Sequence, residues 1–268
     1  MHVFSILTLF PEIIYNSLNY SIIGRAVEEE IIDLRCHNIR DNAINDYGQV
    51  DDKLYGGGRG MLMMVEPIVK TWLSLYLDNP ESFLKKLPDQ MSLGEWHETV
   101  KSVSQDKVIY LSPKGKVFNQ EMAKELSKED HLVFLCGHYE GVDQRALDIL
   151  NVQEISLGDF VLTGGEPAVV VMIDAISRMI PGVLADEEAY LLDSHASGLL
   201  EEPQYTRPSN WKGVKVPEIL LSGHQMKIDC YRKTESLRET LEKRPDLLQK
   251  KRISKEEWIK LIDSRQNN

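Results

Sequence analysis

The glycine pair Gly164–Gly165 is the feature of this sequence best suited to chemistry. It follows the strand-like segment 154–162 and precedes a long apolar, helix-like run at 166–180. Glycines at such a junction let the backbone bend sharply and turn its N–H groups toward a ligand. The first hypothesis is therefore a ligand that is held by backbone groups at this point.

Two more strand-like segments end in loops of small residues. The apolar segment 132–137 runs into Gly137 and Gly141, and the segment 108–112 leads into Pro113. The carboxyl ends of parallel strands share one edge of a sheet, and α/β proteins bind ligands in the crevice at that edge. Three loops of this kind predict a single small-molecule site.

Several common catalytic signatures do not occur in the chain. There is no GxxxxGK[ST] phosphate loop and no GxSxG nucleophile elbow. No HExxH or CxxC motif accompanies the seven histidines, so no zinc site is predicted. The GGGRG run at 56–60 lacks the apolar strand that must precede a dinucleotide fingerprint. A nicotinamide-dependent oxidoreductase is therefore disfavoured.

The three loops need a sheet to hold them together, and the sequence predicts one. Further strand-like segments lie at 3–10 and 32–39, and helix-like segments lie between the strands at 12–29, 65–77, 119–128 and 143–150. Strands that alternate with helices predict an α/β fold with a mostly parallel sheet and helices on both faces.

The remaining segments show less pattern. Residues 78–106 are polar, contain two prolines and have no sustained period, so we expect an inserted excursion and assign it no function. From 181 to 208 the chain reads as a linker. Beyond it the pattern is helical, and Ser254 and Glu257 form a capping-box signature.

The composition predicts a cytoplasmic protein with a full core. Hydrophobic residues make up 42% of the chain and charged residues 27%. Cys36, Cys136 and Cys230 are far apart and odd in number, which fits a reducing compartment without disulfides. No apolar run approaches the roughly 20 residues of a membrane span. The N-terminal apolar run lacks a basic leader and stops at Pro11, so it reads as a strand and not as a signal peptide.

The charge is distributed unevenly along the chain. The net charge is −11, but residues 203–268 hold 15 Lys and Arg against 9 Asp and Glu, a balance of +6. Such asymmetry indicates a tail that faces a polyanion. The alternative is a solvated helical face, because the charges of both signs are mixed at helical spacing.

Six motifs follow one another in the order typical of a single family. They are VDDKLYGGGRGMLMMVEP (50–67), VIYLSPKG (108–115), LCGHYEGVDQR (135–145), SLGDFVLTGGE (156–166), IDAISRMIPGVL (173–184) and DSHASGLLEEPQYTRP (193–208). Together they resemble the bacterial tRNA (guanine-N(1)-)-methyltransferases of the SPOUT superfamily. The resemblance covers nearly the whole chain, from FPE near the N-terminus to RPDLL at 244–248.

The resemblance implies an architecture that periodicity alone does not predict. It implies a SPOUT-type α/β domain at 1–184, within which residues 108–182 form a deep C-terminal trefoil knot that binds the methyl donor. A flexible linker at 185–203 and a small all-helical tRNA-binding domain at 204–268 would follow. Two chains would form a homodimer with composite active sites. The basic balance of the C-terminal residues then becomes an expected phosphate-binding face.

The resemblance also implies the reaction. The methyl donor is S-adenosyl-L-methionine, the substrate is tRNA, and the target is N1 of the guanosine immediately 3′ of the anticodon. The product is 1-methylguanosine, which supports maintenance of the reading frame. The family's activity depends on Mg²⁺, but no carboxylate cluster in the sequence marks an ion site, so no metal ligand is assigned.

Family positions transfer to this sequence residue by residue. The donor would contact Leu111, Ser112, Pro113, Gly137, Tyr139, Glu140, Gly141, Ile155, Ser156, Leu157, Gly158, Asp159, Phe160, Val161, Leu162, Gly164 and Gly165. The tRNA would contact Asp52, Gly57, Gly60, Glu140, Arg145, Ser194 and Arg207. Apolar walls with backbone donors and acceptors suit an adenine ring, and glycines allow its close approach.

Two side chains would carry the chemistry. Ring N1 of guanine bears a proton and is a poor nucleophile until a base removes it. Negative charge then develops on O6, where a fixed guanidinium stabilises it. By resemblance, Asp193 in the linker is the base and Arg178 faces O6. An aspartate on a linker can order over a flipped nucleotide and exclude water.

Two positions depart from the family pattern, and one alternative function remains. Pro167 and Ala168 place the proline one position earlier than the usual Gly-Gly-Glu-Leu-Pro-Ala, and His195 stands where phenylalanine is common. The alternative is a non-catalytic SPOUT-fold protein that binds RNA or senses a nucleotide. Such a protein would be expected to lose the base or the arginine, and this sequence keeps both Asp193 and Arg178.

Overall fold

The computed structural model describes residues 1–185, 194–195, 198–250 and 253–254. The chain forms two units, unit 1 (Met1–Ala185) and unit 2 (Asp186–Asn268), and each is described separately below.

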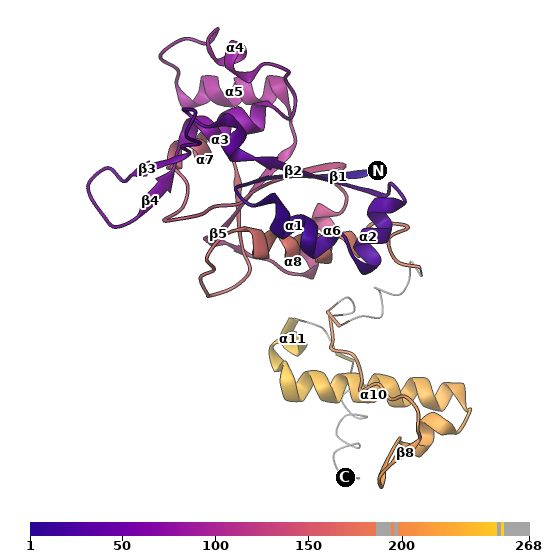
Figure 1. Cartoon of the computed structure of the whole chain (residues 1–268). Helices are drawn as coiled ribbons and strands as arrows, with labels where there is room; N and C mark the ends of the chain where they lie inside the picture. The colour runs from indigo at the N-terminus through magenta and orange to yellow at the C-terminus, as the bar shows by residue number, and fades with distance from the viewer. Residues whose placement is uncertain (186–193, 196–197, 251–252, 255–268) are drawn as a thin grey trace. The chain divides into compact units, whose positions relative to one another are not determined.

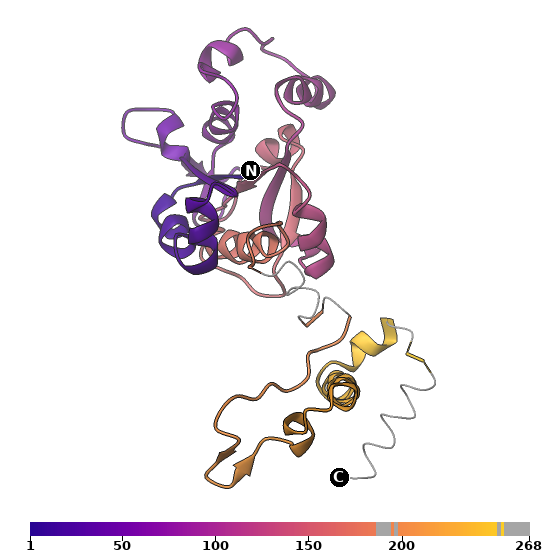
Figure 2. The ribbon, with the colours of Figure 1, turned by 90° about the vertical axis from the view of Figure 1, so that its right-hand side faces the viewer.

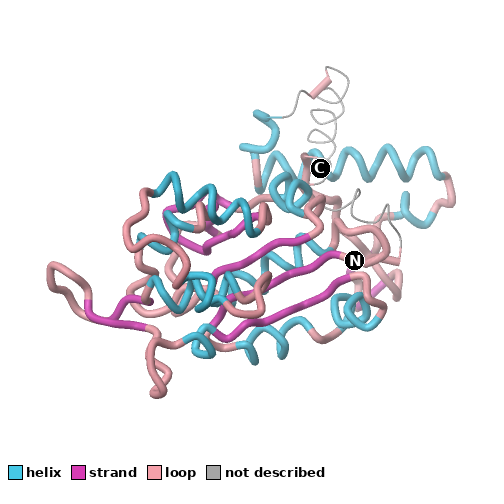
Figure 3. The backbone as a smooth tube through the Cα atoms, turned by 90° about the horizontal axis from the view of Figure 1, so that it is seen from above, coloured by secondary structure: helices cyan, strands magenta, loops and turns pink. Residues whose placement is uncertain are grey.

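Unit 1 is built on a five-stranded sheet. Its strands are β1 (His2–Thr8), β2 (Ile32–Asn38), β5 (Lys107–Val117), β6 (His131–Leu135) and β7 (Gln153–Ser156). Their order is β2-β1-β6-β5-β7, and every pair is parallel. In Figure 3 the strands of this sheet are magenta and lie among cyan helices. This confirms the predicted α/β class with a parallel sheet.

Helices cover both faces of this sheet. One face carries α1 (Pro11–Leu18), α2 (Ser21–Glu28), α6 (Gln120–Leu126) and α8 (Glu166–Ser177). The other face carries α3 (Val65–Leu73), α4 (Pro80–Leu84), α5 (Leu93–Val103) and α7 (Gln144–Ile149). Figures 1 and 2 show the resulting three layers.

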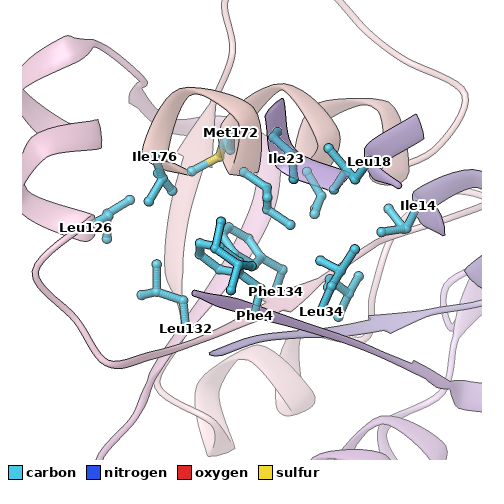
Figure 4. Close-up of a cluster of buried hydrophobic side chains, with 14 of the residues drawn as sticks. Phe4, Ile14, Leu18, Ile23, Leu34, Leu126, Leu132, Phe134, Met172 and Ile176 are labelled. Atoms are coloured by element: carbon cyan, nitrogen blue, oxygen red, sulfur yellow. The ribbon is translucent and has the colours of Figure 1, made fainter. Parts of the chain in front are cut away.

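The strands alternate between two cores because successive side chains point to opposite faces. In β1, Phe4 and Ile6 are buried against α1, α2 and α8, while Leu7 is buried in the core beneath α3 and α7. Figure 4 shows Phe4 beside Phe134 of β6, with the two rings 6.3 Å apart. Each fully buried side chain of this size contributes roughly 1.5–3 kcal/mol, so the register that buries both sets is strongly favoured.

Four segments of unit 1 differ from the prediction. The strand predicted at 108–112 continues to Val117, through the residues that were expected to form a loop. The segment 12–29 forms two helices instead of one, since the chain turns before α2 and Ser21 has a φ of 57°. The excursion at 78–106 contains α4 and α5, and α5 begins with a capping box between Ser92 and Glu95. The strand predicted at 154–162 ends at Ser156 because the Ser156 hydroxyl accepts from the N–H of Gly158, whose φ is 151°.

Unit 1 also contains a short 3₁₀ helix and a hairpin that the sequence did not predict. The 3₁₀ helix η1 spans Ile39–Asn42, and the hairpin consists of β3 (Asp51–Lys53) and β4 (Met61–Met63). The sequence does not reveal this hairpin, because only three residues of each strand pair and the segment 51–60 between and within them is rich in glycine.

Unit 2 contains η2 (Glu218–Leu221), α10 (Gln225–Lys243) and α11 (Pro245–Lys250). The expectation of an all-helical region is wrong at β8 (Asn210–Trp211) and β9 (Val214–Lys215), which pair as a hairpin. Its two turn residues have φ values of 51° and 97°, as the tightest hairpin turns require. Of the predicted capping box at Ser254 and Glu257, Glu257 lies outside the described residues. None of the described helices is long and apolar enough to cross a membrane.

Candidate functional site

A cavity of about 290 Å³ opens in unit 1 where three segments meet. Its walls come from the middle of β5, the loop after β6 and the segment between β7 and α8. Every residue predicted to contact the methyl donor lines this cavity except Asp159, which is exposed. Tyr110, His138 and Ala168 also line it. The parallel sheet thus brings together residues that are up to 58 positions apart, from Tyr110 to Ala168.

The glycine pair lets the start of α8 pack directly against the loop after β6. The N–H of Gly165 donates to the carbonyl oxygen of Gly137 over 2.9 Å. A Cβ on Gly165 would lie 2.8 Å from the Cα of Cys136, and a Cβ on Gly164 would lie 2.3 Å from Cε1 of His138. Real side chains do not tolerate such contacts, so both positions require glycine for close approach and not for an unusual φ.

A buried carboxylate lies beneath this junction. Glu166 is the first residue of α8 and is fully buried. One of its oxygens accepts a 2.5 Å hydrogen bond from the hydroxyl of Thr8, and the other lies 2.6 Å from Nε2 of His138. Since a carboxylate only accepts, Nε2 of His138 carries the hydrogen in this contact. We call this set the Thr8–Glu166–His138 network.

The network is held in place from the surrounding elements. The backbone N–H of Phe10 donates to the Thr8 hydroxyl over 2.9 Å, which leaves the hydroxyl hydrogen for Glu166. The Phe10 ring also contacts the His138 ring at 4.9 Å. Burial, together with the nearby Glu166, holds the pKa of the Cys136 thiol well above its usual range. A buried carboxylate is tolerated only when it is paired, so this network fixes His138 at the wall of the cavity.

The other walls of the cavity are aromatic and aliphatic. The Tyr110 ring packs against Gly137. Burial is the main cause that raises the pKa of the Tyr110 hydroxyl, and the nearby Glu154 raises it further. Phe160, Val161 and Leu162 line the cavity while remaining exposed on their outer sides. A site with apolar walls and a few fixed polar groups suits a small organic ligand.

The β3–β4 hairpin joins the cavity through the loop after β6. The N–H of Met63 donates to the carbonyl of Gly141, and the N–H of Glu140 donates to the carbonyl of Met61. Gly60 lies so close to Glu140 that a Cβ would be 2.6 Å from its carboxylate. Two of the predicted tRNA contacts, Gly60 and Glu140, are therefore adjacent in space.

The other predicted tRNA contacts are more widely spread. Asp52 and Gly57 are exposed on the same hairpin. Arg145, at the start of α7, is exposed and forms a 2.7 Å ion pair with Asp143. Ser194 and Arg207 belong to unit 2, where the Ser194 hydroxyl accepts from the N–H of Glu201.

Of the two predicted catalytic residues, the structure describes only Arg178, and Arg178 does not line the cavity. Arg178 caps the far end of α8, ten residues beyond the cavity-lining Ala168. At 1.5 Å per helical residue this separation is about 15 Å along the axis. Asp193 lies outside the described residues. No group of three or more His, Cys, Asp or Glu side chains that could hold a metal ion occurs among the described residues.

The chain matches known proteins over nearly its whole length. Residues 1–250 match the family model described as tRNA (Guanine-1)-methyltransferase TrmD. The chain belongs to this family. It is 49% identical over 263 residues to a tRNA (guanine-N(1)-)-methyltransferase of Clostridium beijerinckii, covering 98% of both chains. It is 47% identical to the protein of that name from Carboxydothermus hydrogenoformans, covering 96% of this chain and 91% of that one.

Reasoning from the sequence missed the lining residues Tyr110, His138 and Ala168, and also the buried Glu166. The sequence contains no signal that Glu166 is buried, because an acidic residue in the first turn of a helix is common at the surface. Nor did any signal identify Thr8 as its partner, since the two residues are 158 positions apart.

Proposed function

We propose that this protein transfers the methyl group of S-adenosyl-L-methionine to N1 of the guanosine immediately 3′ of the anticodon in tRNA. The product is 1-methylguanosine, which supports reading-frame maintenance. The observation that carries the proposal is the match of residues 1–250 to the tRNA (guanine-1)-methyltransferase family, in a chain whose family-assigned donor residues line one cavity.

The residues of the cavity fit the donor. Glycine backbone at Gly137, Gly164 and Gly165 allows an adenine ring and its ribose to approach the main chain closely. Apolar side chains of the segment after β7 offer a surface for the ring. When bound, the donor supplies an electrophilic methyl group on a sulfonium. The role of the chain is to orient that methyl group and to exclude water.

The chain itself would supply the base and the charge stabilisation. Asp193 would remove the proton of guanine N1, and Arg178 would donate to O6 as negative charge develops there. The segment that carries Asp193 would close over the flipped nucleotide.

The proposal includes a homodimer with composite sites, and the position of Arg178 supports it. Arg178 lies about 15 Å along α8 from the end of the helix that lines its own cavity, so it would serve the cavity of a partner chain. Apolar side chains are exposed around the cavity and on the neighbouring helices, among them Phe10, Ile13, Phe160, Val161 and Val171. Exposed apolar side chains are common in protein interfaces, where a partner chain would cover them.

The remaining family properties enter as parts of the same proposal. The segment 108–182 would form the trefoil knot, and unit 2 would bind the tRNA through its basic side chains. The protein would be cytoplasmic and would depend on Mg²⁺, for which we assign no ligands.

Single-turnover methyl transfer at saturating tRNA tests the assigned roles. Asp193→Asn keeps the size of the side chain but not its basicity, so the rate should fall by about 10²–10⁴-fold. Arg178→Lys should also be slow, because an ammonium does not reproduce the planar donor geometry of a guanidinium. Donor and tRNA affinities should stay close to wild type in both variants, which separates chemistry from binding.

Mixing two inactive variants tests the composite site. Chains with Asp193→Ala and chains with Gly164→Val, which blocks donor binding, should regain part of the wild-type activity when combined. An active monomer in sedimentation, or a near-normal rate for Asp193→Asn, would contradict the proposal.

A further inference from the structure

Unit 2 contains a cavity of about 430 Å³, and of its lining residues only Arg207 has been given a role above, as a predicted tRNA contact. One wall is the extended segment 202–209, and the other is a face of α10 that includes Ile228 and Tyr231. η2 supplies Leu220 and Leu221 at its edge. The volume falls within the range of small-ligand sites, about 300–1,000 Å³. The cavity lies within one unit and needs nothing from the other.

The lining combines aromatic rings with guanidinium groups. Tyr205 comes from the extended segment and is about half exposed, and Tyr231 comes from α10. The two tyrosines line the same cavity. Burial is the main cause that raises the pKa of Tyr231, and the neighbouring Glu235 and Tyr205 raise it further. Arg207 and Arg232 line the same cavity.

The two arginines differ in their partners. Arg232 lies 3.5 Å from the carboxylate of Glu202, which also accepts from the side chain of Gln204. Arg207 is exposed and makes no hydrogen bond or ion pair with any residue that the structure describes. The cavity therefore presents one compensated guanidinium and one that is available to an anion.

Aromatic and basic side chains also occur next to the cavity. The β8–β9 hairpin begins and ends at the cavity lining. Its two flanking residues, Ser209 and Val216, line the cavity, and the N–H of Val216 donates to the carbonyl of Ser209. On the hairpin Trp211 is exposed, with the ammonium of Lys212 5.2 Å from its ring. Figure 2 looks along α10 and shows the extended chain that leads to this hairpin. Residues 203–232 contain five Lys and Arg against two Asp and Glu.

We infer that this cavity is a binding site for one unstacked nucleotide of the RNA substrate, with the base against Tyr205 and Tyr231 and a phosphate at Arg207. Proteins hold single-stranded and loop nucleotides by stacking bases on aromatic side chains beside basic groups. The inference rests on the proposed tRNA substrate and adds a site for a nucleotide other than the one that is methylated.

Affinity for an unmodified tRNA transcript, measured by filter binding with the full-length protein, tests the inference. Tyr205→Ala should raise Kd by roughly 5- to 150-fold, the cost of one base–aromatic stack. Tyr205→Phe keeps the ring and should bind like wild type. Arg207→Ala should weaken binding and lower the slope of log K against log salt by about 1, whereas Tyr205→Ala should leave that slope unchanged.

Two matched controls isolate the cavity. Arg244→Ala removes the same charge from α10's end, where the guanidinium pairs with Asp246 away from the cavity lining. Tyr20→Ala removes an exposed tyrosine from unit 1. Donor affinity and thermal midpoint should match wild type in all variants.

Three outcomes would overturn the inference. Tyr205→Ala could bind tRNA like Tyr20→Ala, Arg207→Ala could change the salt slope no more than Arg244→Ala, or Tyr205→Ala could alter the sedimentation of the free protein, which would make the cavity an interface between copies. If instead the wild-type protein neither binds nor methylates tRNA, the proposed function itself fails.

Discussion

The glycine at position 164 offers the sharpest structural test, because a single methyl group should disrupt both stability and the cavity. In Gly164→Ala the new Cβ would lie 2.3 Å from Cε1 and 2.6 Å from Nε2 of His138, and 2.9 Å from a carboxylate oxygen of Glu166. The backbone at this position has no left-handed φ, so the effect is purely steric. The imidazole ring must move away from the carboxylate.

The magnitude follows from two losses. Overpacking of a close-packed site typically costs about 1–3 kcal/mol. Loss of a hydrogen bond to a buried charged group adds about 1.5–3 kcal/mol. The free energy of unfolding should therefore fall by about 2.5–6 kcal/mol, and Tm by roughly 5–25 °C for a domain of this size. Donor affinity should fall as well, since His138 lines the cavity.

The same substitution at Gly94 is the matched control. Gly94 lies in α5, and a Cβ there would have only the Ser92 hydroxyl oxygen near it, at 3.9 Å. Replacing a helical glycine by alanine with no clash stabilises by about 0.5–1 kcal/mol. The two glycine-to-alanine changes should therefore shift Tm in opposite directions.

Thermal unfolding with and without S-adenosyl-L-methionine measures both effects. A double-mutant cycle with His138→Ala identifies the clash, because Gly164→Ala should cost far less once the ring is gone. A Tm for Gly164→Ala equal to that of Gly94→Ala, or strict additivity in the cycle, would refute the packing that we describe.

Two further predictions follow from ionisable groups. Burial by itself raises the pKa of Asp106, but hydrogen bonds from neighbouring hydroxyl groups and the nearby His131 outweigh it and hold that pKa below its ordinary value. The ionised Asp106 therefore stabilises the fold fully above the pKa of about 3.9 that it has in the unfolded chain, and this contribution is lost as pH falls through its pKa in the folded protein. Between about pH 5 and pH 3, the Tm of Asp106→Asn should therefore fall less than the Tm of the wild type. Equal losses would contradict this sign. Burial raises the pKa of Cys36 to about 11, whereas Cys230 is exposed. A thiol reagent at mildly alkaline pH should therefore label Cys230 first in peptide mapping, and faster labelling of Cys36 would count against its burial.

Local pattern was sufficient to predict the sheet and the loops of the cavity. In the five-stranded sheet of unit 1, β1 and β6 are mostly apolar runs that the sequence alone marks as buried strands. Small residues after β6 and β7 and within β5 predicted the cavity, since neighbouring parallel strands bring such segments to one edge of the sheet. These signals lie within a few residues of the elements that they predict.

Long-range pairing set the limit of prediction. The hydrogen bond from Thr8 to Glu166 joins residues 158 positions apart, and no spacing within either segment predicts it. The distance of Arg178 from its own cavity depends on the direction in which α8 runs, which the sequence does not specify. By contrast, the start of α5 could have been predicted, because Ser92 and Glu95 have the spacing of a capping box. The polar composition of the segment obscured this signal.

Identification of the methylated nucleoside is the most direct test of the central claim. The protein would be incubated with S-adenosyl-L-methionine labelled in its methyl group and an unmodified tRNA transcript that carries guanosine 3′ of the anticodon. The RNA would then be digested and its nucleosides separated by mass. We predict 1-methylguanosine at that position alone, and no transfer to a transcript with adenosine in its place. Methylation of another atom or nucleoside, or equal transfer to both transcripts, would contradict the proposed function.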